Sequence, residues 1–119
     1  MLTGKFRSVK RLVKASGYSW DGLVFTWRNE TAFQQESLAF LVMFPLAFWW
    51  PETHIESAIL VMSLFVVLIA ELINTAIEAA IDRHGNESHQ WSGVAKDVAS
   101  AAVLLALIQC VLVWLLVLY

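Results

Sequence analysis

The chain has 119 residues, of which 59% are hydrophobic, and its mean hydropathy is +0.65. A water-soluble domain of this size has too little interior to bury so much apolar side chain, so we expect much of this protein to lie in lipid. The formal net charge of −2 argues against a polyanionic partner such as nucleic acid, and the single cysteine, Cys110, excludes an internal disulfide.

The N-terminal region is basic and amphipathic. Five of the eight Lys and Arg residues lie in the first fourteen positions, where they alternate with apolar residues at helical spacing. This pattern predicts a helix on the anionic inner leaflet, ended by Gly17. A second amphipathic stretch is expected from Asp21 toward Glu36. We treat residues 1–30 as an amphipathic surface-helix region.

Three segments are predicted to cross the membrane, at about 31–50, 55–82 and 97–118. The third is the clearest, because residues 98–119 contain no charge over a length of about 33 Å of helix. The first has a short apolar run of its own, so its helix is expected to begin near Thr31 and to carry Glu36 at its inner end. Pro45 favours a kink in that helix.

The basic residues also predict an orientation. No Lys or Arg lies in the link 51–54 between the first two spans, whereas all eight lie in the N-terminal segment or between the second and third spans. The positive-inside rule therefore places the N-terminus in the cytoplasm and the C-terminus on the outer side. The expected fold is an all-α, multi-pass membrane protein with three transmembrane helices and one surface helix.

The second span ends in a polar stripe, in which Glu71, Asn74, Glu78 and Asp82 share an arc of about 80°. A carboxylate beside lipid costs about 2.5–3.5 kcal/mol, so we expect the stripe to face protein, metal or substrate. Glu71 and Glu78 lie about 10 Å apart along the helix, too far to share one ion. We expect Glu78 to help bind a divalent cation and Glu71 to accept a proton. The alternative is a pair of buried acids held by interhelical hydrogen bonds.

Glu30 and Glu36 flank the entry to the first span. They are either solvated acids or part of a cation site, since Mg²⁺ takes one or two carboxylates together with substrate phosphates, and Glu30 is placed to join Glu78.

Lys96 and Asp97 lie near the start of the third span, where a helix N-terminus and a cation can receive a phosphate; a lysine that anchors the span at the interface is the alternative. No Gly-rich phosphate loop and no protein-kinase signature is present. The alanines of the third span share one face, which predicts a packing seam between helices or subunits: Ala95, Ala99, Ala102 and Ala106.

The motifs GYSWDGL, NETAFQQE, ELINTAIEAAIDRHG and SGVAKDVASAAVLLA occur in this order along the chain. With the basic N-terminal helix they resemble the prokaryotic diacylglycerol kinase family, small integral-membrane lipid kinases, over nearly the whole chain. The resemblance implies a homotrimer in the bacterial cytoplasmic (inner) membrane, with active sites at the subunit interfaces. The implied reaction transfers the γ-phosphoryl group of ATP to the free hydroxyl of diacylglycerol, giving phosphatidate, with Mg²⁺ as cofactor.

The resemblance also implies a role for each matching position. Glu71 would be the general base, Glu30 and Glu78 would hold Mg²⁺, and Asn74 would support the stripe. The nucleotide would be bound by Arg11, Tyr18, Glu30, Glu78, Glu87, Ser88, His89, Lys96 and Asp97. The lipid site would be lined by Ser16, Gly17, Tyr18, Ser19, Trp20, Gln35, Glu36, Glu71, Ser100 and Trp114. The chain departs from the family pattern at Ser88, often aromatic there, and at Gln34 and Val94, both often basic.

Three other functions stay open at this point. The acceptor is either diacylglycerol or, as in a variant of the same family, the polyprenol undecaprenol. A small cation-coupled transporter also uses membrane glutamates, but its acids need no matching cytoplasmic acids and lysine. A purely structural membrane subunit has little reason to keep acids that are so costly in lipid.

Overall fold

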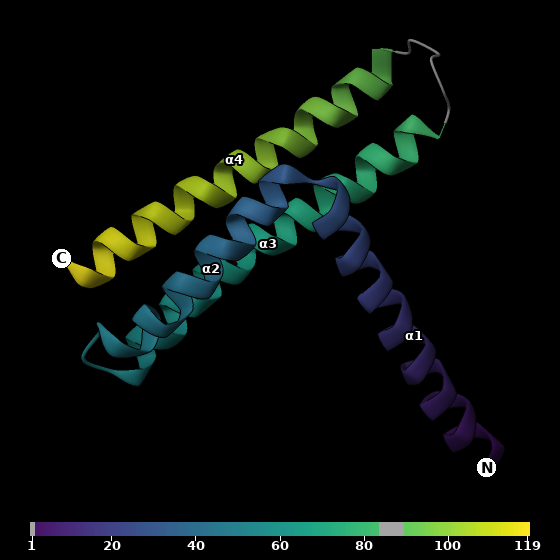
Figure 1. The fold of residues 1–119 in the computed structure, drawn as a ribbon, viewed down its shortest axis with the longest axis horizontal. Helices are drawn as coiled ribbons and strands as arrows, with labels where there is room; N and C mark the ends of the chain where they lie inside the picture. The colour runs from purple at the N-terminus through teal and green to yellow at the C-terminus, as the bar shows by residue number, and fades with distance from the viewer. Residues whose placement is uncertain (1, 84–89) are drawn as a thin grey trace.

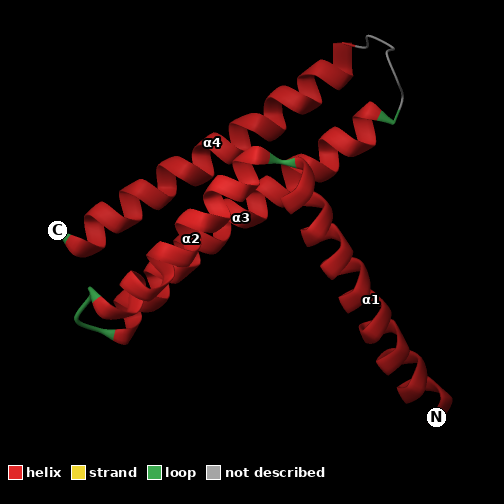
Figure 2. Ribbon diagram, in the orientation of Figure 1, coloured by secondary structure: helices red, strands yellow, loops and turns green. Residues whose placement is uncertain are grey.

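The computed structural model describes residues 2–83 and 90–119, with side chains from Arg7 onward. These residues form helices and no strand (Figure 2). The helices are α1 (Leu2–Asn29), α2 (Thr31–Trp49), α3 (His54–Asp82) and α4 (Gln90–Leu118).

The helices α2, α3 and α4 form an antiparallel bundle, and α1 projects away from it (Figure 1). In the bundle α3 is central, because it contacts α2, α4 and the end of α1. The C-terminus lies at the same end of the bundle as the turn between α2 and α3 (Figure 1).

The helix bounds confirm the predicted start of α2 at Thr31, and α2 continues unbroken through Pro45. The prediction that Gly17 ends the first helix is wrong, because α1 runs through it to Asn29 with no positive φ at the glycine. Glycine inside a helix costs only about 1 kcal/mol relative to alanine, and helical residues on both sides outweigh that cost. The fourth helix begins at Gln90, seven residues before the predicted start of the third span at about 97.

Two of the described helices, α3 and α4, are long and apolar enough to cross a membrane. Each has 29 residues, and their most apolar 18-residue windows have mean hydropathies of 2.3 and 2.9. Many of their large apolar side chains point outward, among them Val98, Leu105 and Leu116, each more than half exposed. Such surfaces need lipid or another protein chain as a partner.

The interior of the bundle is small and lies toward the end that carries the C-terminus. Ala47, Leu60, Leu64 and Trp114 bring α2, α3 and α4 together, and Leu60 is fully buried. A polar contact joins α3 to α4 beside this cluster. The Trp114 indole donates to Ser63 Oγ over 3.0 Å, and the Gln109 amide donates to the Ser63 carbonyl over 2.9 Å. These bonds fix the register of the two helices where apolar packing alone would let them slide.

Candidate active site

The acidic side chains predicted to form a site gather where α1, α2 and α3 meet. Glu30 lies at the junction of α1 and α2, Glu36 lies near the start of α2, and Glu71 and Glu78 lie in the second half of α3. The end of α1 contacts both α2 and α3, so the junction lies against α3 (Figure 1). Segments that are distant in sequence therefore bring their carboxyl groups to one place.

Glu71 is the one acidic side chain among the described residues that is buried, with 5% of its surface exposed. Its carboxyl group lies within hydrogen-bonding reach of that of Glu36 on α2. Two carboxylates offer no donor, so this contact requires a proton on one of them. The second oxygen of Glu36, Oε2, is buried without a partner. The pair thus has room for one more donor, such as a hydroxyl group.

Two further carboxylates act on Glu71. Glu30 and Glu78 are both partly buried, and their charges are close enough to repel a charge on Glu71. Like charges held together in a partly buried place are unfavourable unless a proton or a cation compensates them. The arrangement therefore favours binding of a positively charged group.

The amide of Asn74 links the polar stripe along α3. Its Nδ2 donates to Glu78 Oε1 over 3.1 Å, which orients that carboxylate, while its Oδ1 is buried without a partner. Free amide and carboxylate oxygens are the ligands that Mg²⁺ prefers. In the part of the chain that the structure describes, no group of three or more Asp, Glu, His or Cys side chains is arranged to hold a metal alone.

Lys96, at the first turns of α4, reaches back to the end of α3. Its Nζ lies 2.7 Å from Asp82 Oδ1, and the two side chains are 43% and 64% exposed. Asp82 is the last member of the polar stripe, so this ion pair places a cation on the same face as Glu78. Asp97 and Ser100, which follow on α4, are exposed.

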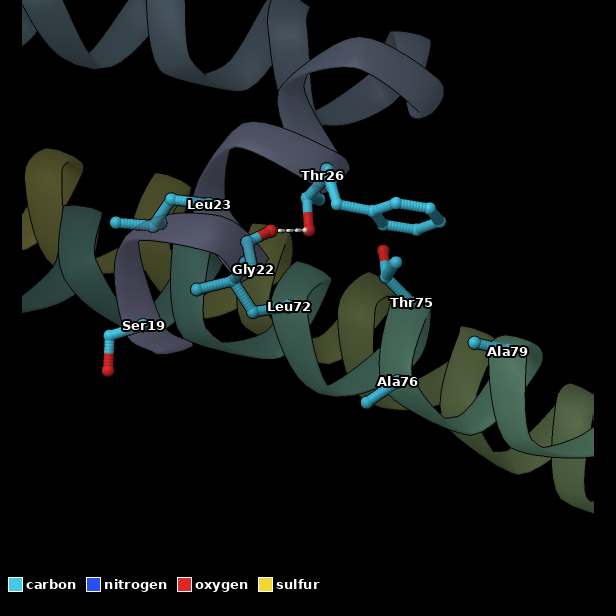
Figure 3. A pocket seen from close by; sticks show the side chains of 9 residues that line it. Ser19, Gly22, Leu23, Thr26, Leu72, Thr75, Ala76 and Ala79 are labelled. Atoms are coloured by element: carbon cyan, nitrogen blue, oxygen red, sulfur yellow. Dashed lines mark hydrogen bonds between the residues drawn. The ribbon is translucent and has the colours of Figure 1, made fainter. Parts of the chain in front are cut away.

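A cavity of about 480 Å³ lies between the end of α1 and α3 (Figure 3), and its α3 wall includes Leu72 and Thr75, which lie between Glu71 and Glu78 in the sequence. Its α1 wall is made of Ser19, Gly22, Leu23, Phe25 and Thr26, and its α3 wall of Leu72, Thr75, Ala76 and Ala79. The Thr26 hydroxyl is satisfied by the Gly22 carbonyl at 2.8 Å, whereas the buried Thr75 hydroxyl has no partner. The lining is apolar except for the small side chains of Ser19, Thr26 and Thr75, which suits a hydrocarbon chain better than a charged ligand.

Several predicted site residues lie on the surface of this chain. Arg11, Ser16, Gly17, Tyr18, Trp20 and Gln35 are exposed, and of the expected lipid-lining turn 16–20 only Ser19 lines the cavity. Trp114 is buried in the apolar interior of the bundle. Glu87, Ser88 and His89 lie outside the described residues.

Sequence reasoning missed two features of this region. It left Glu36 as a solvated acid, part of a cation site or, by resemblance, part of a lipid site, and did not predict its contact to Glu71, although an acid near the start of an apolar helix was the available signal. It also gave no role to Thr75, whose only signal is a hydroxyl on the buried side of α3.

Comparison with known proteins gives a consistent result. Residues 17–118 match the family model for prokaryotic diacylglycerol kinase. A protein named diacylglycerol kinase from Escherichia coli (strain K12) is 47% identical over 109 residues, which cover 92% of this chain and 89% of the relative. Proteins with the same name from Helicobacter pylori (strain ATCC 700392 / 26695) and Haemophilus influenzae are 42% and 39% identical, each over 92% of this chain and over 86% and 93% of the relatives.

Proposed function

The chain belongs to the prokaryotic diacylglycerol kinase family, and we propose that it transfers the γ-phosphoryl group of ATP to the free hydroxyl of diacylglycerol, giving phosphatidate. The observation that carries the proposal is the buried Glu71 carboxyl group, held against Glu36, near the like charges of Glu30 and Glu78, and one helical turn from Thr75 in the wall of an apolar cavity. Phosphoryl transfer to an alcohol requires a base for the hydroxyl proton, neutralisation of phosphate charge and positioning of the two substrates. The residues around Glu71 offer all three.

Glu71 acts as the general base. Glu36 keeps its proton and donates a hydrogen bond to one oxygen of Glu71. The other oxygen of Glu71 is then free to accept the proton of the lipid hydroxyl. The cavity between α1 and α3 holds part of an acyl chain. The glycerol hydroxyl of the same lipid then lies toward Glu71. Burial of Glu71 keeps water from competing with the lipid for the phosphoryl group.

Glu30 and Glu78 would hold Mg²⁺ on the ATP phosphates, and the free Oδ1 of Asn74 is placed to support them. When bound there, the ion screens the charge of the phosphates. Asn74 keeps the Glu78 carboxylate in its orientation through the 3.1 Å bond from Nδ2. Lys96 exchanges Asp82 for a phosphate oxygen, with Asp97, Arg11, Tyr18 and the 87–89 segment on the nucleotide side.

We place three spans, α2, α3 and α4, in the bacterial inner membrane, with α1 on its cytoplasmic surface and the C-terminus on the outer side. Nineteen residues of α2 give about 28 Å of helix, enough for the hydrocarbon core. The position of the basic residues supports this topology. The acidic group then opens toward cytoplasmic ATP.

The protomers assemble as homotrimers with the active sites at the subunit interfaces. An open apolar groove of about 620 Å³ runs between α3 and α4, lined by Ala95, Ala99 and Ala102 on one side and by α3 residues that include Asn74 on the other. Small residues let a helix of a neighbouring copy approach closely. A helix seated there lies beside the metal-binding end of the stripe, so that the nucleotide residues exposed in one protomer meet the acids of the next.

A direct assay tests this function. The protein purified in detergent or lipid is given ATP, Mg²⁺ and either dioleoylglycerol or undecaprenol, and phosphorylated lipid is measured. Phosphatidate as the main product is the expected result. Preference for undecaprenol would reassign the acceptor, and no product with either acceptor would overturn the kinase proposal.

A further inference from the structure

A single residue separates α1 from α2. Glu30 has extended backbone angles, φ −117° and ψ 107°, between two long helices. Its amide donates to the Thr26 carbonyl at 2.9 Å, and its carbonyl accepts from the Gln34 amide at 3.1 Å. One residue of extended backbone acts as a hinge, because a small change in its two dihedral angles swings the whole of α1.

A side-chain hydrogen bond crosses this hinge. The side-chain amide of Gln34, in the first turn of α2, donates through Nε2 to the Trp27 carbonyl. Trp27 lies seven residues earlier, in the last turn of α1. Carbonyl groups in the last turn of a helix lack the amide donors of a following turn. The Gln34 side chain on α2 therefore supplies a donor to a carbonyl at the end of α1 that has no donor within its own helix. A second amide nearby, Asn29 Nδ2, donates to the Phe25 carbonyl at 2.8 Å and stays within α1.

The bond between Gln34 and Trp27 opposes a force that opens the hinge. Glu30 lies between its two ends, and the Glu30 carboxylate is near enough to Glu71 to repel its charge. Before a cation binds, this repulsion pushes the junction of α1 and α2 away from α3. A brace across the hinge keeps Glu30 in place in the cation-free protein. Binding of the cation then costs less free energy, because Glu30 does not have to be ordered at that moment.

We propose that Gln34 is a positioning residue, which braces the junction of α1 and α2 so that the Glu30 carboxylate stays beside Glu71 and Glu78 at the metal-binding end of the site. The inference rests on the proposed function only for the identity of the ligand. The side chain of Gln34 donates to a backbone carbonyl and not to a carboxylate, so its effect reaches the reaction through the position of Glu30.

The test compares Gln34→Met, which keeps the length of the side chain and removes the donor, with Asn29→Ala, which removes the amide bond that does not cross the hinge. Binding of Mn²⁺ is measured by electron paramagnetic resonance of the full protein with a non-hydrolysable ATP analogue. Gln34→Met should weaken Mn²⁺ binding by about two- to tenfold, the range for one net hydrogen bond, while Asn29→Ala stays within about twofold of the parent. The Mg²⁺ concentration for half-maximal activity should rise in parallel, with kcat at saturating Mg²⁺ retained.

A second measurement reads the hinge itself. Nitroxide labels at Lys14 on α1 and Ala80 on α3, in a Cys110→Ser background and diluted with unlabelled protein, should show a broader distance distribution in Gln34→Met and an unchanged one in Asn29→Ala. Unaltered Mn²⁺ affinity and an unaltered distribution in Gln34→Met would overturn the brace, as would equal losses in both variants. If the parent protein binds Mn²⁺ but phosphorylates no lipid, the proposed function is overturned. The Mn²⁺ affinities of the two variants would still test whether Gln34 braces the hinge.

Discussion

Replacement of Glu71 by glutamine separates the chemical role of this residue from its structural role. The side chain is 5% exposed, contacts Glu36 and lies within the repulsive field of Glu30 and Glu78. Glutamine has the same shape, and its amide can donate to Glu36 without a shared proton. Glu71→Gln should therefore fold, with a thermal midpoint equal to or above that of the parent protein, because one of the crowded charges is gone.

The loss of activity in Glu71→Gln should be large. A positioned general base contributes about 10²–10⁴-fold to the rate, equivalent to about 3–5 kcal/mol of activation free energy. The assay measures kcat in mixed micelles at saturating Mg²⁺, ATP and dioleoylglycerol, and the affinity for an ATP analogue is measured separately. We expect kcat to fall by at least about a hundredfold, with nucleotide affinity changed by less than about threefold.

The matched control for this change is Thr75→Val, one turn farther along α3. Thr75 is as buried as Glu71, at 6% exposed, and its hydroxyl has no partner to lose. This variant should keep most of the activity. A Glu71→Gln variant with more than a tenth of the parent kcat would refute the assignment of the base, and a Thr75→Val variant as inactive as Glu71→Gln would show that packing, not proton transfer, explains the loss.

Three other changes probe the remaining parts of the molecule. Glu78→Gln should raise the Mg²⁺ concentration for half-maximal activity by about tenfold or more, and an unchanged titration would remove this residue from the metal site. Trp114→Phe deletes the donor to Ser63 and should lower the free energy of unfolding in detergent by about 0.6–1.7 kcal/mol, whereas no change would mean that apolar packing alone sets the register of α3 and α4. Asp82→Asn releases Lys96 for the nucleotide and should lower KM for ATP by about twofold at constant kcat; a higher KM would show that the ion pair holds the lysine in its working position.

Much of the fold could be predicted from the sequence because each helix has a local signal. The end of α3 at Asp82 follows from the end of the apolar periodicity, and the start of α2 at Thr31 follows from the length that a span requires. The error at Gly17 arose because glycine is both a common helix terminator and a tolerated helix residue. Only the surrounding helix, continuous from Leu2 to Asn29, decides between them.

The candidate site was predictable in its members but not in its contacts. The spacing of Glu71, Asn74 and Glu78 places them on one face of any helix, so their shared stripe needs no tertiary information. The contact between Glu36 and Glu71 depends on how α2 is rotated against α3, and the hydrogen bond from Gln34 to Trp27 depends on a hinge that one residue creates. Helix rotation and hinge angle are properties of packing, which periodicity within one helix does not determine.

The electrostatics of the acidic group link stability to function. The acidic group consists of Glu30, Glu36, Glu71 and Glu78, whose charges lie close enough to repel one another and so destabilise the resting protein. Apolar packing elsewhere in the bundle, such as the Leu60 cluster, offsets this destabilisation. A ligand that brings positive charge removes this repulsion, so it binds more tightly than it would to the same oxygens spread apart. Substitutions that relieve the repulsion, beginning with Glu71→Gln, should therefore stabilise the fold and weaken catalysis together. A destabilised and active Glu71→Gln protein would contradict both halves of this reasoning.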